Sequence, residues 1–103
     1  MRTAWKNLER TTARVLGGKR NCRGDDFGQS LPDVEHPTFS VECKYRKSLP
    51  RLLRLGLADA ARYDSSKPPL LVIKEKYQRG AIVVMKMEDF TRLFGNLLEH
   101  MDK

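Results

Sequence analysis

The sequence predicts an α/β fold in which helices flank a mixed central β-sheet. Three stretches repeat apolar residues at helical spacing, near the two ends and in the middle of the chain. Shorter runs between them are β-branched or alternate apolar with polar residues, as strands do. With 103 residues, 40% hydrophobic and 32% charged, the chain is expected to form one globular domain, 1–103.

The first predicted element is a helix over residues 3–16. Trp5, Leu8 and Leu16 repeat there at helical spacing, and Gly17 supplies the stop. The same spacing places Trp5 in the core.

Three strands are predicted next, over residues 19–23, 31–35 and 38–45. The first is polar, as in an edge strand facing solvent. In the third, Glu42 and Lys44 are two residues apart, so they point to one face of the sheet while the apolar residues between them point into the core.

The second half predicts a helix from Pro50 to Tyr63, buried strands at 70–73 and 81–85, and a final helix whose apolar stripe runs from Phe90 to Met101. The predicted order is therefore helix, three strands, helix, two strands, helix.

The charge indicates a polyanionic partner. Lys and Arg number 20 against 13 Asp and Glu, and residues 1–54 carry a net charge of +6 out of +7. Nucleic acid is the commonest such partner, although an acidic membrane surface would also attract these charges.

The sequence has no run of membrane-spanning length and no apolar signal core, and Cys22 and Cys43 suit reduced thiols. We therefore expect a cytoplasmic protein that does not bind membranes.

Three residues form the candidate catalytic centre. If the second and third strands pair, Asp33 can reach the same spot as Glu42 and Lys44. Two carboxylates can hold Mg²⁺ and leave water positions free, and the metal activates a bound water. A neighbouring lysine can orient that water or stabilise negative charge, so the set suits phosphodiester cleavage. The alternative for Glu42 and Lys44 is a surface salt bridge.

The spacing Pro32-Asp33, eight residues, Glu42-Cys43-Lys44 resembles the PD-(D/E)XK nuclease superfamily, and within it the archaeal-type Holliday junction resolvases. The resemblance extends from about Trp5 to Val84. It implies a restriction-endonuclease-like αβββαββα core. It also implies that Asp33, Glu42 and the backbone carbonyl of Cys43 bind Mg²⁺, with Mn²⁺ as a possible substitute.

Two further residues occupy places that match these resolvases, Glu9 on the first helix and Ser30 shortly before Asp33. The resemblance implies that Glu9 supports a metal ion or its waters. The alternatives are a solvated Glu9 paired with a nearby arginine, and a turn role for Ser30, which could still contact a phosphate. One departure is the first strand, which is usually apolar in the family and is polar here.

Basic residues cluster in the same half as the acidic ones. They are expected to bind the phosphates of duplex DNA along a track leading to the metal site. The candidates are Arg10, Arg14, Lys19, Arg20, Arg23, Arg46 and Lys47, together with Ser30.

The function expected from these observations is a Mg²⁺-dependent, structure-selective endonuclease acting on branched double-stranded DNA, with a Holliday junction resolvase as the first choice. It would need no small-molecule cofactor. The alternatives are another nicking or repair nuclease of the superfamily, or a non-catalytic nucleic-acid-binding module of the same fold.

A homodimer is also expected, because resolving a junction requires two symmetric cuts. In the middle helix Leu53 and Leu57 form a stripe with Leu49, and Leu52 and Leu55 lie outside it. Leucines left in water usually mark an interface. The last helix adds Phe90, Phe94, Leu97 and Leu98. The alternative is that both helices wrap one monomeric core.

Overall fold

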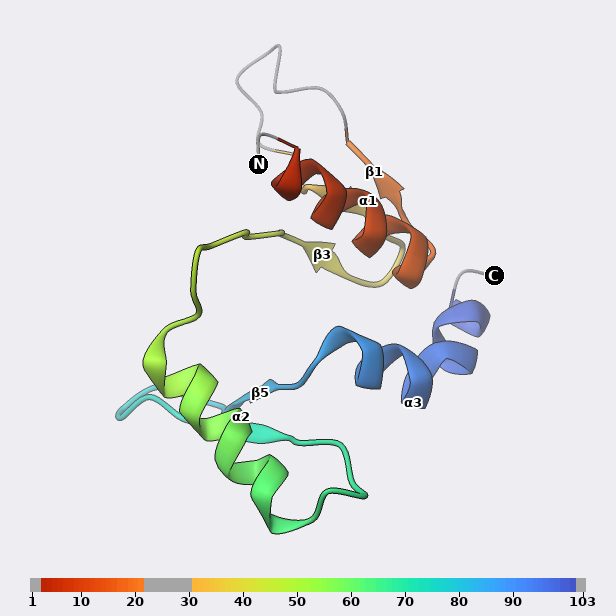
Figure 1. Cartoon of the computed structure of the whole chain (residues 1–103). Coiled ribbons are helices and arrows are strands. Elements are labelled where there is room, and N and C mark those ends of the chain that lie inside the picture. Colours follow the sequence, from red (N-terminus) through yellow and green to blue (C-terminus); the bar gives the residue numbers. More distant parts are fainter. Residues whose placement is uncertain (1–2, 22–30, 102–103) are drawn as a thin grey trace. The chain divides into compact units, whose positions relative to one another are not determined.

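The computed structural model describes residues 3–21 and 31–101, and residues 96–101 as backbone only. Figure 1 shows its helices and antiparallel strands. Their order along the chain is α1 (Ala4–Leu16), β1 (Lys19–Arg20), β2 (Val34–Glu35), β3 (Ser40–Val41), α2 (Arg51–Tyr63), β4 (Leu71–Ile73), β5 (Ile82–Val84) and α3 (Met87–Met101). The α/β class and the predicted order of elements are confirmed. None of the described helices is long and apolar enough to cross a membrane.

The chain divides into two compact units, Met1–Arg46 with Leu93–Lys103, and Lys47–Arg92. The first unit contains α1 and the three-stranded sheet β1–β2–β3. The second contains α2 and the two-stranded sheet β4–β5.

In the first unit α1 ends where two glycines allow the chain to turn sharply onto the sheet. Gly17 adopts φ 75°, the left-handed conformation that suits glycine at a helix end. Gly18 donates its N–H to the Ala13 carbonyl at 2.8 Å. A Cβ atom on Gly18 would lie 2.4 Å from the Glu35 carbonyl oxygen, so β1 can approach β2 this closely only with glycine there.

The core of this unit lies between α1 and the sheet. Val34 on the central strand is fully buried, and α1 turns Glu9, Thr12 and Ala13 toward the interior. Strand β1 pairs with β2 through Arg20 opposite Val34, which makes it an edge of this sheet as its polar sequence predicted.

The turn between β2 and β3 is held by His36. Its Nδ1 accepts the N–H groups of Thr38 and Phe39, at 3.0 and 3.3 Å. Its Nε2 lies 2.9 Å from the Leu16 carbonyl oxygen, which can only accept, so Nε2 carries the proton. The imidazole thereby ties this turn to the last carbonyls of α1.

The third strand is shorter than predicted, ending at Val41 instead of Tyr45. Asp33 donates its N–H to the Val41 carbonyl at 3.0 Å, and beyond it Pro32 has no N–H to continue the ladder. The alternation nevertheless continues past the strand. Cys43 stays half-buried, whereas Glu42 and Lys44 are exposed, as predicted.

One other expectation differs from the structure. Trp5 is 48% exposed instead of buried, and the Lys6 ammonium lies 5.4 Å from the centre of its ring. The described strands form two antiparallel sheets, in which every described pair joins strands that are neighbours in the sequence.

In the second unit α2 packs closely on β4. A Cβ atom on Gly56 would lie 2.7 Å from the Leu71 methyl groups, so the missing side chain permits the contact. Leu53 and Leu57 are half-buried on this side, whereas Leu52 and Leu55 are 65% and 40% exposed, as the sequence predicted. Leu49, expected on the buried stripe, is 54% exposed because it precedes the first turn of α2.

Candidate active site

Asp33 is anchored by its backbone and by its side chain. Its N–H bonds to Val41, and its carbonyl accepts the N–H of Asn21 at 3.1 Å. Its carboxylate oxygen Oδ2 accepts the backbone N–H of Cys43 at 2.7 Å. The side chain therefore replaces the missing ladder bond and fixes Asp33 beside the residues that follow β3. The sequence-based expectation that Asp33 lies near Glu42 depends on this pairing.

The Cys43 thiol shows where the acidic side chains gather. Burial raises its pKa above the ordinary value of 9.0, while a hydrogen bond with Thr12 lowers it. The nearby carboxylates of Asp33, Glu9 and Glu42 raise the pKa of the thiol further. Carboxylates from three separate stretches of the chain therefore act electrostatically on one thiol.

Glu9 is buried in the first unit, where 7% of its surface is exposed. Its Oε1 accepts a hydrogen bond from the Arg20 Nε at 2.8 Å. A buried carboxylate needs such a partner, because an unpaired charge in the interior is costly. The alternative of a solvated Glu9 is therefore wrong, although its predicted pairing with an arginine is confirmed. Arg20, which is also a predicted DNA-binding residue, has the Nε of its guanidinium on Glu9.

Glu42 and Lys44 are joined by an ion pair, with the Lys44 Nζ 3.0 Å from the Glu42 Oε2. Their side chains are 60% and 62% exposed. An ion pair this open to water is weak and easily exchanged for other partners. Both groups can therefore turn toward a ligand at little cost.

Carboxylate oxygens are the donors that Mg²⁺ prefers, so the chemistry of Asp33 and Glu42 fits such an ion. Within residues 3–21 and 31–101 there is, however, no group of three His, Cys, Asp or Glu residues that could hold a metal ion. Glu9 is held by Arg20, and Glu42 is paired with Lys44. The arrangement offers two candidate carboxylate ligands and a third carboxylate engaged nearby.

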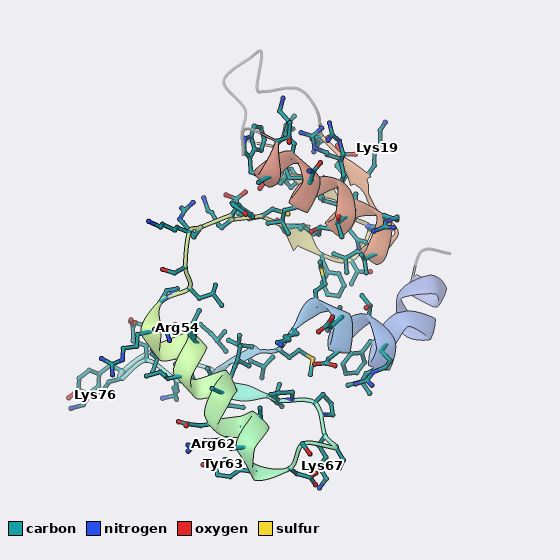
Figure 2. All side chains as sticks on the ribbon, in the orientation of Figure 1. Lys19, Arg54, Arg62, Tyr63, Lys67 and Lys76 are labelled. Carbon is teal, nitrogen blue, oxygen red and sulfur yellow. The ribbon has the colours of Figure 1, made fainter. Side chains whose placement is uncertain are left out.

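The candidate DNA-binding residues fall into three groups. Arg10, Arg14, Lys19, Arg46 and Lys47 are exposed, and Lys19 is labelled on β1 in Figure 2. Arg20 is half-buried against Glu9. Arg23 and Ser30 lie outside the described residues.

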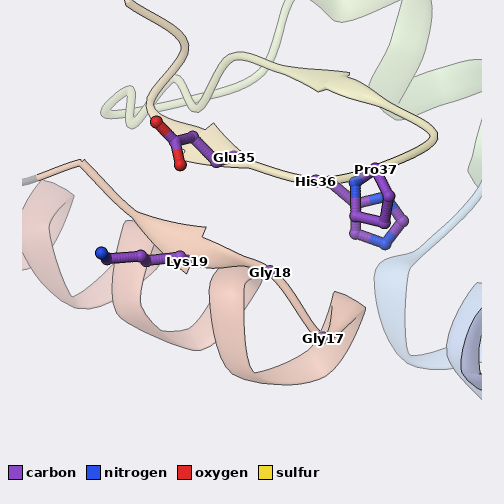
Figure 3. A pocket seen from close by; sticks show the side chains of 6 residues that line it. All are labelled: Gly17, Gly18, Lys19, Glu35, His36 and Pro37. Carbon is purple, nitrogen blue, oxygen red and sulfur yellow. The ribbon is translucent and has the colours of Figure 1, made fainter. Parts of the chain in front are cut away.

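A pocket of about 480 Å³ opens at the C-terminal end of α1, shown in Figure 3. A helix C-terminus carries partial negative charge, which disfavours phosphate, and both ring nitrogens of His36 already make hydrogen bonds. The pocket is lined by Gly17, Gly18, Lys19, Glu35, His36 and Pro37, a set that contains none of the predicted catalytic residues.

Two residues that position the site were not predicted. Thr12 lies one turn after Glu9 and bonds to Cys43. Asn21 bonds to Asp33 through its N–H and to the Pro32 carbonyl through its side-chain amide at 2.7 Å. Thr12 could have been predicted from its spacing of three residues from Glu9, which places both on one helix face. Asn21 could not, because a polar residue after an edge strand is common and does not indicate a role in a site.

Comparisons of the chain with protein-family models, with curated proteins and with solved structures found no match.

Proposed function

We propose that the chain is a metal-dependent, structure-selective DNA endonuclease that acts on branched double-stranded DNA, with a four-way Holliday junction as the preferred substrate. The observation that carries the proposal is the hydrogen bond from the Cys43 N–H to the Asp33 carboxylate, which holds Asp33 beside the Glu42–Cys43–Lys44 segment in a chain of net charge +7. The finer fold, a restriction-endonuclease-like αβββαββα core with a mixed sheet, is part of the proposal. The order of elements supports it.

Asp33 and Glu42, with the backbone carbonyl of Cys43, would hold Mg²⁺, for which Mn²⁺ can substitute. When bound, such an ion lowers the pKa of a coordinated water and offsets phosphate charge. Asp33 suits the role because its bond to the Cys43 N–H holds it in place.

Lys44 would leave its exposed pair with Glu42 and orient the attacking water or stabilise charge on the phosphate. Glu9, held by Arg20, would position waters at the edge of the site. In the reaction a water oxygen bonds to phosphorus, the bond from phosphorus to the leaving sugar oxygen breaks, and that oxygen takes up a proton.

A non-catalytic nucleic-acid-binding module is the second candidate. The observation that favours it is the pairing of two of the three carboxylates with basic side chains, Glu9 with Arg20 and Glu42 with Lys44. Such neutralised acids would no longer repel phosphate, so a basic surface could bind DNA without a metal ion.

The test compares cleavage of labelled four-way junction, nicked, flap and linear DNA by the full chain with Mg²⁺. Asp33→Asn and Glu42→Gln are expected to slow cleavage about 100-fold or more, since each removes a charged ligand of the metal ion that would stabilise the reacting phosphate. Asn at position 33 keeps an oxygen that can accept the Cys43 N–H, so the fold is preserved. Asp59→Asn, an exposed carboxylate on α2, is the matched control and should cleave normally.

Thermal unfolding supplies a readout besides activity. Mg²⁺ is expected to raise the melting temperature of the wild-type chain and not that of Asp33→Asn, because only a bound ligand stabilises the native state. Undiminished cleavage by Asp33→Asn would overturn the active site. Tight DNA binding by the wild-type chain, with neither cleavage nor a Mg²⁺ effect, would establish the second candidate instead.

A further inference from the structure

The loop between β4 and β5 contains a tyrosine in an unfavourable backbone conformation. The N–H of Gln78 donates to the Glu75 carbonyl at 3.1 Å and closes a turn, in which Tyr77 is the third residue. Tyr77 has φ 69°, and it is the only non-glycine residue with positive φ in the described part of the chain. Glycine or asparagine normally fills this position, and a bulky side chain there is unfavourable.

Packing does not offset this cost, because Tyr77 is 88% exposed. Its ring contacts the Lys76 ammonium, which lies 5.0 Å from the ring centre. Gly80, three residues later, adopts φ 77° with open space around it, so the same loop uses glycine where no side chain is needed. A strained, exposed aromatic residue indicates that the ring serves a partner outside the chain.

The residues around the ring select the class of partner. Lys74, Lys76 and Arg79 surround Tyr77 in the loop, against one acidic residue, Glu75, and all are exposed. Figure 2 shows Lys76 at the tip of the loop, directed away from the rest of its unit. An apolar protein surface would not favour so many charges, whereas a polyanion with aromatic groups would use both the cations and the ring.

We propose that the β4–β5 loop binds an unstacked nucleobase of DNA, with Tyr77 as the stacking platform and Lys74, Lys76 and Arg79 on the flanking phosphates. Stacking on an aromatic side chain requires an accessible base face, which an intact duplex does not offer and a branch point, bulge or flap does. The inference rests on the proposed function for its choice of DNA, and it names the feature of the substrate that the chain recognises.

The test measures binding in EDTA, so that cleavage plays no part. Fluorescence anisotropy compares a duplex containing a bulge of unpaired bases with a fully paired duplex of the same length. Tyr77→Gly is expected to bind the bulged DNA about 10-fold more weakly, since it loses the stacking of one base. Tyr77→Phe should retain the affinity. The fully paired duplex should bind both forms of the chain alike.

Tyr63→Gly is the matched control, because Tyr63 is 84% exposed in the same unit, at the C-terminal end of α2. It should not change the preference for bulged DNA. Tyr77→Gly should also unfold at the same or a higher temperature than the wild-type chain, since glycine relieves the strain at this position. A lower melting temperature would mean that Tyr77 is structural.

Equal affinity of Tyr77→Gly and the wild-type chain for bulged DNA would overturn the inference, and so would an equal loss on paired DNA. Either result can occur in a chain that cleaves DNA normally, so neither would contradict the proposed nuclease activity. Conversely, if Tyr77→Gly loses the preference for bulged DNA and the wild-type chain shows no Mg²⁺-dependent cleavage, base binding by the loop would be supported and the nuclease activity refuted.

Discussion

At the scale of single residues, the site is organised by polar groups that bond to backbone. The carboxylate of Asp33 replaces a ladder bond to Cys43, and the ring of His36 joins the β2–β3 turn to the end of α1. Each of these bonds satisfies a backbone group that the short strands or the end of α1 leave unpaired. The bond of Asp33 to Cys43 also fixes a candidate catalytic residue.

The first prediction at this scale concerns the reactivity of Cys43. Burial raises the pKa of its thiol and three carboxylates raise it further, against the opposing bond from Thr12. Since the thiolate is the nucleophile, iodoacetamide should react more slowly with the folded chain than with the urea-unfolded chain. The midpoint of the rate against pH should lie above 9.0 in the folded chain. The measurement uses a Cys22→Ser background.

The raised pKa of the Cys43 thiol also makes the stability of the fold depend on pH. The folded state holds the thiol proton more tightly than the unfolded state, so this contribution to stability is fully present below the unfolded pKa. It is lost as the pH rises through the folded pKa. Cys43→Ser should lack this alkaline loss, and an identical rate midpoint in folded and unfolded chains would refute the assigned environment.

The sequence predicted the candidate side chains of this site, a Glu42–Lys44 salt bridge as an alternative and an arginine near Glu9, but not which arginine. Alternation along the chain predicted that Glu42 and Lys44 share an exposed face while Cys43 turns inward, and the structure agrees. It could not predict that Arg20 bonds to Glu9, because that pair joins elements whose approach depends on Gly18 and the buried Val34. Which arginine meets a buried carboxylate is decided by packing, not by periodicity.

At the scale of elements, helix and strand periodicity was a sound guide to order and a poorer guide to length. The helix α1 was predicted nearly to its ends because an apolar stripe and two glycines define it. The third strand was predicted four residues too long at its C-terminal end. Its alternating pattern continues to Tyr45, but its partner strand is preceded by Pro32, which cannot pair.

The prediction for the elements concerns the contact of α2 with β4. Gly56→Val should lower the free energy of unfolding by about 1–3 kcal/mol, since its side chain meets the Leu71 methyl groups. Gly95→Val in α3 is the matched control, because nothing lies within 4 Å of a Cβ there, and it should leave stability nearly unchanged. Urea denaturation measures both.

The double variant Gly56→Val with Leu71→Ala distinguishes the steric clash with Leu71 from the effect of valine on the helix propensity of α2. Removing the leucine methyl groups should relieve the clash, so the two losses should sum to more than the loss of the double variant. Additive losses would show that α2 and β4 do not meet at this position.

At the scale of the whole molecule, net charge was the property best predicted from composition. The excess of basic residues is present whatever the fold, and it motivates a DNA partner. The mixed central sheet was less accessible to prediction, because a sheet order depends on pairings between strands distant in sequence. The described pairs are all local, so they do not test it.

The last prediction is that the chain is a homodimer that uses the exposed side of α2. Gly56 faces β4, whereas Leu52 and Leu55 lie on the helix with 65% and 40% of their surface exposed. A two-fold axis would bring this patch against its own copy and present two equivalent sites to the two strands of a junction. Sedimentation at micromolar concentration should give a dimer for the wild-type chain and a monomer for Leu52→Gln with Leu55→Gln. Arg51→Gln, an exposed neighbour, is the control and should remain dimeric.

Circular dichroism should show that the double glutamine variant keeps its helices, because both replaced leucines are exposed. If the dimer makes the paired cuts, this monomer should nick a four-way junction on one strand without resolving it. The alternative, in which α2 and α3 only wrap a monomeric core, predicts a wild-type monomer both free and on junction DNA. That outcome would remove the physical reason to prefer a junction resolvase to a nicking nuclease, since a single site cannot cut two strands of opposite polarity symmetrically.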